Sequence, residues 1–386
     1  MRSLNFNLIP VILLVCSQAA VADLPRRDGA HEEDYPGIDI EYGSLHVGDG
    51  IRLRTILTKP VGVERPPVIL FVQWLSCNTV EIRPDRDNGW LQMMRGMVRE
   101  SGWALMRTDK RGVGDSEGGP CSELDYETEL ADHRAAIAAL AERTDVDTSR
   151  IVVFGASMGS RMASQVAADA PGVVGVLGWG GGSKTWFERM QAFDRNALEL
   201  GDGSADEIAT RMREHQAFYA QYLLEGRNPL AIIEANPAMA AVWSDIIGTS
   251  ADAHYGRAFA FHQQAQQQDW TAAWGEIDVP VLMVMGEYDW FENQAGHETV
   301  VRIVNRQQPG LARFEVIPQM DHHVTGVPAA RAAFRDDDGR GDASPFLALA
   351  LTWLKKLSVG TFKGTVTLSA RRKGDFAWHL QSLSPG

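Results

Sequence analysis

The stretch Ile151-Val-Val-Phe-Gly-Ala-Ser-Met-Gly-Ser160 decides how this chain is expected to fold. Its first four residues are apolar and mostly β-branched, which is typical of a buried strand. The small residues between Gly155 and Gly159 permit a sharp turn. After the turn, Met162 and Val166 recur at helical spacing until Pro171-Gly172 ends the pattern. The sequence therefore predicts a strand, a tight turn and a helix in direct succession.

The turn contains the pattern G-x-S-x-G with Ser157 at its centre. A serine hydroxyl is a weak nucleophile and must project from the backbone toward a base. A strand-to-helix turn exposes the hydroxyl, and the helix that begins there favours developing negative charge. We therefore interpret Ser157 as a nucleophile and the Met158 N–H as one donor of an oxyanion hole. The alternative is a glycine-rich loop in an α/β protein of another kind.

The composition restricts the class of protein. The chain has 386 residues, of which 45% are hydrophobic, and this is enough to bury a large core. The net charge of −13 disfavours nucleic acid and anionic membrane surfaces as partners, because both repel an acidic protein.

The N-terminal stretch has the features of a targeting segment. Arg2 supplies a positive charge, and the range from Leu8 to Cys16 is apolar. Ala20-Val-Ala22 matches the A-x-A pattern of small residues before a signal-peptide cleavage site. The apolar run is too short to cross a bilayer as a helix. We therefore predict a signal peptide over residues 1–22 and a secreted or periplasmic mature protein without a membrane anchor.

Strand and helix patterns alternate over residues 38–182 and again over residues 276–358. This alternation predicts an α/β protein with a mostly parallel central sheet covered by helices on both faces. Residues 183–275 show a helical pattern and no strand, so we expect a helical cap inserted into a core of residues 23–182 and 276–358. No structure is predicted for the tail, residues 359–386.

The strand, the G-x-S-x-G turn and the helix, followed later by an acid and a histidine, resemble the α/β-hydrolase superfamily. In that superfamily the triad order is serine, acid, histidine, and the acid follows the strand after the cap. Here that strand leads into Gly286-Glu-Tyr-Asp289, so the resemblance implies Asp289 as the acid. Glu287 and Glu292 are alternatives.

The resemblance also places the base and the second oxyanion donor. The histidine follows the last strand, where Asp321-His322 is similar to a frequent ending, so we favour His322 as the base over its neighbour His323. The second donor follows the strand of residues 68–72. Many relatives carry His-Gly there, whereas this chain has Gln73-Trp-Leu75, and we favour the Leu75 amide over that of Trp74.

The resemblance implies hydrolysis of an ester, thioester or amide without a cofactor or metal. We expect an exported carboxylic ester hydrolase that acts on a small-molecule or peptide acyl substrate, and the oligomeric state stays open. Several aromatic residues flank the expected site and are candidates for an apolar substrate pocket, although each one taken alone is more typical of a core: Trp74, Trp179, Trp186, Phe187 and Trp290. The alternatives are a serine peptidase of the prolyl-oligopeptidase or X-Pro dipeptidyl type and a binding module without activity.

Removal of the signal peptide would leave two cysteines, Cys77 and Cys121. Cys77 follows the strand expected to supply the second oxyanion donor. Cys121 follows residues 109–116, a loop similar to the D-x-R-G-x-G-x-S loop of many capped hydrolases, which we interpret as structural. Both strands should end at the edge of the sheet that carries the site, and export favours oxidation. We therefore predict a Cys77–Cys121 disulfide, and the alternative is two buried free thiols.

Overall fold

The computed structural model describes residues 33–84, 86–248, 250, 253–336 and 339–358. The predicted signal peptide and the tail lie outside these residues. Within them, no helix is long and apolar enough to cross a membrane.

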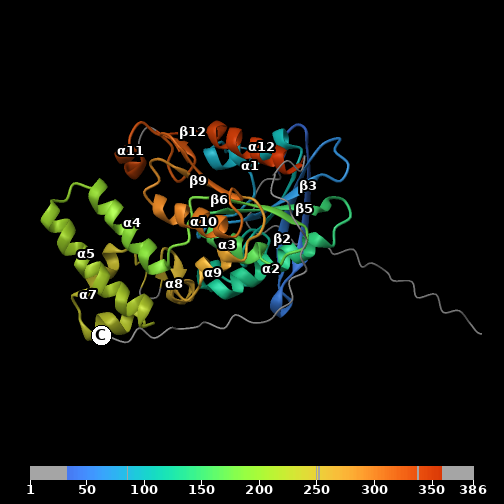
Figure 1. Cartoon of the computed structure of the whole chain (residues 1–386). Coiled ribbons are helices and arrows are strands. Elements are labelled where there is room, and N and C mark those ends of the chain that lie inside the picture. The colour runs from blue at the N-terminus through green and yellow to red at the C-terminus, as the bar shows by residue number, and fades with distance from the viewer. Residues whose placement is uncertain (1–32, 85, 249, 251–252, 337–338, 359–386) are drawn as a thin grey trace, which may run out of the picture.

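An eight-stranded sheet forms the centre of the protein (Figure 1), with the strand order β1-β2-β4-β3-β5-β6-β9-β10. The pairs β1–β2 and β2–β4 are antiparallel, and the other neighbours are parallel. The expected mostly parallel sheet is therefore confirmed. The strands are β1 (Ile38–His46), β2 (Arg52–Pro60), β3 (Pro67–Val72), β4 (Ala104–Thr108), β5 (Asp147–Ala156), β6 (Val173–Trp179), β9 (Val281–Gly286) and β10 (Ala312–Ile317).

Helices cover both faces of this sheet, as Figure 1 shows. One face packs against α1 (Gly89–Ser101) and α12 (Ser344–Ser358), and the other against α2 (Tyr126–Ala141), α3 (Met158–Ala167) and α10 (Gln294–Gln307). Side chains of a strand point alternately to the two faces. In β5, Val152 and Phe154 accordingly join the cluster under α1 and α12, whereas Ile151 and Val153 join the other. Both clusters need continuous apolar runs, which is why the central strands lack polar alternation.

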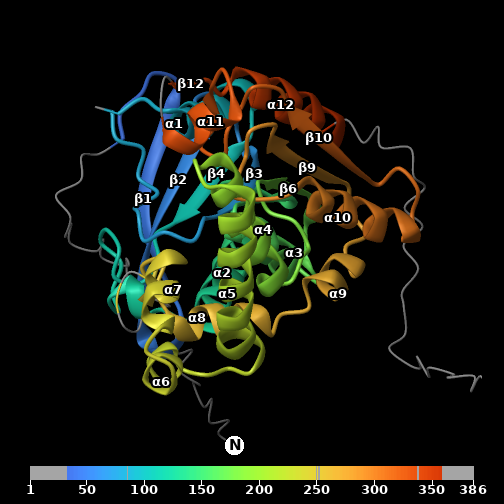
Figure 2. The same ribbon diagram turned by 90° about the vertical axis from the view of Figure 1, so that its left-hand side faces the viewer.

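The segment between β6 and β9 forms a cap beside the carboxyl ends of the strands (Figure 2). It is mostly helical, but the expectation that it holds no strand is wrong. A short hairpin turns at Tyr255-Gly256, where both residues have positive φ, and two-residue strands are too short to show an alternating pattern. The cap elements are α4 (Trp186–Leu200), α5 (Ala205–Tyr219), the π-helical turn η3 (Ala220–Leu224), α6 (Pro229–Ala235), α7 (Met239–Asp245), β7 (Ala253–His254), β8 (Arg257–Ala258), α8 (Phe259–Gln266) and α9 (Trp270–Gly275).

Shorter elements complete the described chain. A second hairpin pairs residues on the two sides of α11, and single turns of 3₁₀ helix follow β1 and the loop after β4. These elements are η1 (Gly48–Gly50), η2 (Cys121–Glu123), β11 (Thr325–Gly326), α11 (Ala330–Arg335) and β12 (Arg340–Gly341).

Candidate active site

Ser157 lies in the sharp turn between β5 and α3. Its backbone has φ 56° and ψ −118°, a conformation that a non-glycine residue adopts only where the surrounding structure imposes it. The two glycines of the pattern allow close backbone approaches, and these approaches impose the conformation of Ser157. A Cβ at Gly155 would lie 2.2 Å from the Gly159 carbonyl oxygen, and a Cβ at Gly159 would lie 2.0 Å from that of Val72. The start of α3 therefore lies directly against the end of β3.

Asp289 and His322 come together from the loops after β9 and β10. The His322 Nδ1 lies 2.7 Å from Asp289 Oδ2, and both residues are buried. The other carboxylate oxygen, Oδ1, accepts the backbone N–H groups of Phe291 at 3.0 Å and Glu292 at 3.2 Å, which holds the carboxylate in place. Because Nδ1 faces the carboxylate, Nε2 is the ring nitrogen left for a substrate or a serine.

Gly180, at the end of β6, makes room for this pair. Its φ is +57°, and a Cβ there would lie 2.8 Å from His322 Cε1 and 3.1 Å from Asp289 Oδ2. Trp179 beside it donates its indole N–H to the His322 carbonyl oxygen at 2.9 Å. The residues at the end of β6 therefore leave room for the His322 ring and hold its backbone in place.

The environment shifts the pKa of His322 upward. Burial alone would lower this pKa, but the charge and the hydrogen bond of Asp289 favour the imidazolium and outweigh it. General-base catalysis requires a base that can take a proton from the serine and that is stabilised once it is charged.

The alternative triad residues are engaged elsewhere. Glu287 is exposed and accepts the N–H of Gln319 at 2.8 Å. Glu292 is buried between two guanidinium groups, with Arg161 at 3.0 Å and Arg189 at 3.1 Å. His323 is exposed, and its ring lies 3.9 Å from Asp321. The structure thus pairs Asp289 with His322, and the alternative acids Glu287 and Glu292 have other partners.

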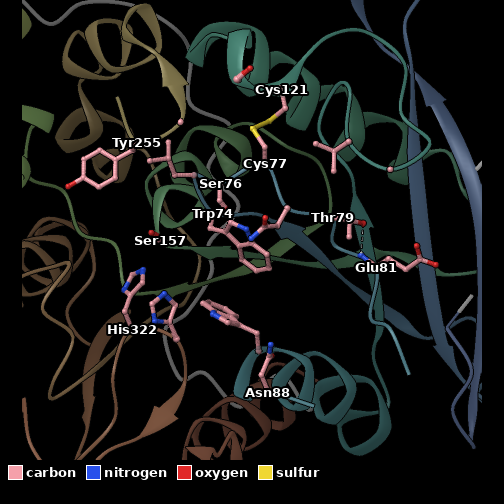
Figure 3. Close-up of a pocket in the computed structure, with 18 of the residues that line it drawn as sticks. Trp74, Ser76, Cys77, Thr79, Glu81, Asn88, Cys121, Ser157, Tyr255 and His322 are labelled. Carbon is pink, nitrogen blue, oxygen red and sulfur yellow. Dashed lines mark hydrogen bonds between the residues drawn. A yellow bond between two sulfur atoms is a disulfide. The ribbon is translucent and has the colours of Figure 1, made fainter. Parts of the chain in front are cut away.

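Ser157 and His322 line one cavity of about 950 Å³ and lie beside each other at one end of it (Figure 3). Trp74 and Leu75 line the same cavity, and Met158 occupies the first position of α3 directly after the serine. The cavity therefore brings together the proposed nucleophile, the proposed base and the loop expected to supply the second oxyanion donor.

The predicted aromatic pocket needs correction. Of its members, only Trp74 lines the cavity that contains Ser157. Trp179 is fully buried beneath His322, Trp186 is buried in the cap beside His262, and Trp290 lines a separate cavity of about 780 Å³. Three aromatic residues that the sequence did not single out line the site instead: Trp90, Tyr255 and Phe291.

The two cysteines form a disulfide, with their Cα atoms 5.8 Å apart, and both line the cavity. The bond ties the loop after β3 to the start of η2 (Figure 3). Among the described residues, no group of three or more histidines, cysteines and carboxylates is arranged to hold a metal ion.

The sheet order, the strained turn after β5 and the cap after β6 define an α/β hydrolase. Residues 49–310 match the family model of the X-Pro dipeptidyl-peptidase (S15 family). Because this match covers more than half of the chain, the protein belongs to that family.

Three known proteins are similar to this chain. The α/β hydrolase domain-containing protein WAV2 of Arabidopsis thaliana is 32% identical over 173 residues, and the match covers 43% of this chain and 52% of WAV2, so the chain spans about half the length of that relative. Carboxyl esterase 2 of Tuber melanosporum has a TM-score of 0.52 at 15% identity, over 86% of this chain and 89% of the esterase. The acylaminoacyl peptidase of Pyrococcus horikoshii has a TM-score of 0.51 at 10% identity, over 83% of this chain and 41% of the peptidase. At such identities the two structures establish the fold alone.

Proposed function

We propose that the protein is an exported serine hydrolase that cleaves carboxylic esters through an acyl-enzyme. The observation that carries this proposal is the 2.7 Å contact between His322 and Asp289 in a cavity shared with Ser157. The Ser157 hydroxyl adds to the substrate carbonyl and its proton passes to His322 Nε2. The same proton then leaves with the alcohol, and water repeats the sequence to release the acid.

The amides of Met158 and Leu75 are the proposed donors to the oxyanion that forms in each addition step. Donors held in place before the reaction stabilise this charge without a cost of reorganisation. Asp289 keeps His322 in the tautomer with its proton on Nδ1 and stabilises the imidazolium.

The cavity favours an ester over an N-terminal dipeptide. A dipeptidyl peptidase must recognise the free α-ammonium group of its substrate, for which a carboxylate is the complementary partner. Among the described residues that line the cavity, Glu81 is the one carboxylate, and it lies 3.1 Å from the Arg54 guanidinium. Arg83, Arg86 and Arg189 also line the cavity, so it presents more positive than negative side chains.

The second candidate is a serine peptidase, which the family match supports. The same triad cleaves amides, and the distinction rests on which substrate fits the cavity. Export is proposed from the signal-peptide pattern, and a disulfide is typical of an oxidising compartment.

Purified mature protein assayed against p-nitrophenyl esters and X-Pro p-nitroanilides tests the proposal. We expect ester turnover, covalent labelling by a fluorophosphonate, and a loss of both in Ser157→Ala, with kcat lower by about 10⁴-fold or more. Turnover of the anilides alone would favour the peptidase. Near-normal esterase activity in Ser157→Ala would contradict the assignment of the nucleophile.

A further inference from the structure

Three consecutive backbone carbonyls of the loop after β3 converge on one buried ammonium group. Lys110 is 3% exposed, and its Nζ donates to the carbonyl oxygens of Trp74, Leu75 and Ser76, the last two at 3.1 Å. Burial lowers the pKa of Lys110 to about 8 against the opposing charge of Glu129, so the ammonium form is the main one at neutral pH.

A second cation reaches the same loop from the cap. Arg257, in β8, donates from Nη1 to the Leu75 carbonyl oxygen at 2.7 Å. Its Nη2 donates to the Leu124 carbonyl oxygen at 2.9 Å and to Glu129 Oε2 at 2.7 Å. Glu129 also lies 3.1 Å from Lys110, so one carboxylate supports both cations behind the loop. His133 Nε2, at 4.0 Å from the same carboxylate, is the other titratable group of this cluster.

The direction of the carbonyls determines the direction of the amides. In a planar trans peptide the N–H points opposite to the C=O of the same unit. Carbonyls of residues 74–76 that point at Lys110 therefore turn the N–H groups of Leu75, Ser76 and Cys77 away from it. The loop lines the cavity and Lys110 does not, so the loop separates the ammonium from the cavity. Within the described chain, none of these three N–H groups has a hydrogen-bond acceptor.

We propose that Lys110, assisted by Arg257, is a positioning residue that turns the oxyanion amides toward Ser157. This inference rests on the proposed function of the same site. A glycine would let an amide face the site without steric cost, and this loop has none between Gln73 and Cys77. The ammonium imposes the orientation on non-glycine residues and holds it before substrate arrives, which is the condition for strong oxyanion stabilisation.

The test is Lys110→Met, with the exposed Lys355→Met as the matched control. We expect kcat on a p-nitrophenyl ester to fall about 10²- to 10³-fold, as when an oxyanion donor is removed, with KM within threefold. Affinity for a trifluoromethyl ketone should fall by the same factor. In that adduct the Ser157 oxygen bonds to the ketone carbon, its proton moves to His322, and the carbonyl oxygen becomes the oxyanion.

A second variant covers the case in which Lys110→Met does not fold. Lys110→Met with Glu129→Gln removes one charge of each sign, so the cluster keeps its net charge while the carbonyls lose their ammonium. A folded variant with normal kcat would overturn the inference, as would a rise in KM alone or a failure of both variants to fold. If the wild-type protein is neither active nor labelled by the fluorophosphonate, the proposed function itself fails, which is a separate result.

Discussion

The core and the cap of this molecule share one apolar cluster but differ in the polar contacts that hold them in place. Strands such as β3 and β9 are buried along their whole length and are joined by backbone ladders. The cap meets the core through side chains. Its apolar residues, such as Phe261 and Trp270, join the same buried cluster as the helices of the core. Polar side chains add individual contacts, for example Arg257 on Glu129 and the Trp270 indole on the Tyr126 hydroxyl at 2.9 Å. Apolar patterning can place a strand in a sheet, but it cannot specify which buried polar groups will meet.

A buried histidine of the core and two buried histidines of the cap have pKa values shifted in opposite directions. In the core, the carboxylate of Asp289 raises the pKa of His322. In the cap, burial lowers the pKa of His254 to about 3 and holds that of His262 well below its usual value. His322 is therefore ready to accept a proton, whereas His254 and His262 stay neutral. The difference follows the neighbouring carboxylates and not the region, since Asp194 and Asp245 raise the pKa of His215 in the cap and burial lowers that of His133 in the core to about 4. The predictions below test this contrast.

The largest expected effect separates the two adjacent histidines of the core. His322→Ala should lower kcat to the level of Ser157→Ala, about 10⁴-fold or more below wild type, because His322 is the cavity histidine whose Nδ1 is paired with Asp289. His323→Ala is the matched control and should keep most of the activity, since its side chain is exposed. Ester turnover by both variants measures the difference, and a dead His323→Ala with an active His322→Ala would move the base by one residue.

Much of the core could be predicted from sequence because each step had a local cause. The apolar run before Gly155 predicts a buried strand, and the small residues around Ser157 predict the turn that the φ of 56° requires. The order of acid and histidine after the cap led to Asp289 and His322, which the structure places 2.7 Å apart.

The rest depended on tertiary contacts. Trp179 and Leu177 lie two residues apart in β6, so their side chains face the same side of the sheet. Trp179 therefore joins the cluster under α12 and does not reach the cavity. The glycines of residues 109–116 favour a structural interpretation of this loop, but nothing in the sequence shows that Lys110 reaches three carbonyls of another loop. The hairpin at Tyr255-Gly256, which carries Arg257, was too short to detect.

The next effect concerns the disulfide, which joins two loops of the core beside the cavity. Replacing Cys77 and Cys121 by serine should lower the free energy of unfolding by about 4 kcal/mol, less any strain, because the bond closes a loop with a sequence separation of 44. It should also lower kcat, since Cys77 follows the carbonyls that Lys110 holds. Chemical denaturation and ester kinetics measure both quantities.

Reduction of the wild-type protein by dithiothreitol should reproduce both effects, whereas the serine variant should not respond. Two freely alkylated thiols in the unreduced mature protein would contradict the bond, and unchanged kcat after complete reduction would separate stability from catalysis.

A smaller effect is expected in the cap on acidification. The folded pKa of His254 lies below its unfolded value of about 6.5, so the unfolded state binds more protons below that pH. The stability that neutral His254 preserves is complete above pH 6.5 and is lost progressively as the pH falls toward 3. At pH 5 the loss is about 2 kcal/mol from this residue alone.

Chemical denaturation at pH 7.5 and pH 5 measures this loss. His254→Gln keeps a donor for the Ile246 carbonyl, which His254 contacts at 2.7 Å, and should be less stable at pH 7.5 but lose less on acidification. The exposed His46→Gln is the control and should behave as wild type. Equal losses in all three proteins would show that His254 is not buried in its neutral form.

The smallest expected effect is a shift in the acid limb of catalysis, and it tests the core side of the same contrast. The base must be neutral to take the Ser157 proton, so kcat/KM should fall as the pH drops through the pKa of His322. Because Asp289 stabilises the imidazolium, that pKa lies above the usual value of about 6.5, and the limb should appear above it. Glu287→Gln removes a nearby carboxylate that contacts Gln319 and not the histidine, and it should leave the limb unchanged.

Removing the Asp289 charge should reverse the direction of this shift. Burial alone lowers the pKa of a histidine, so Asp289→Asn should move that of His322 below the wild-type value. The variant will be nearly inactive because the amide favours the wrong tautomer, so the titration is better followed by NMR of the His322 Cε1 proton in Ser157→Ala with and without Asp289→Asn. A pKa that does not fall when the carboxylate is removed would mean that another group stabilises the protonated form of His322. Glu292, which also favours the imidazolium, would then be the residue to replace next.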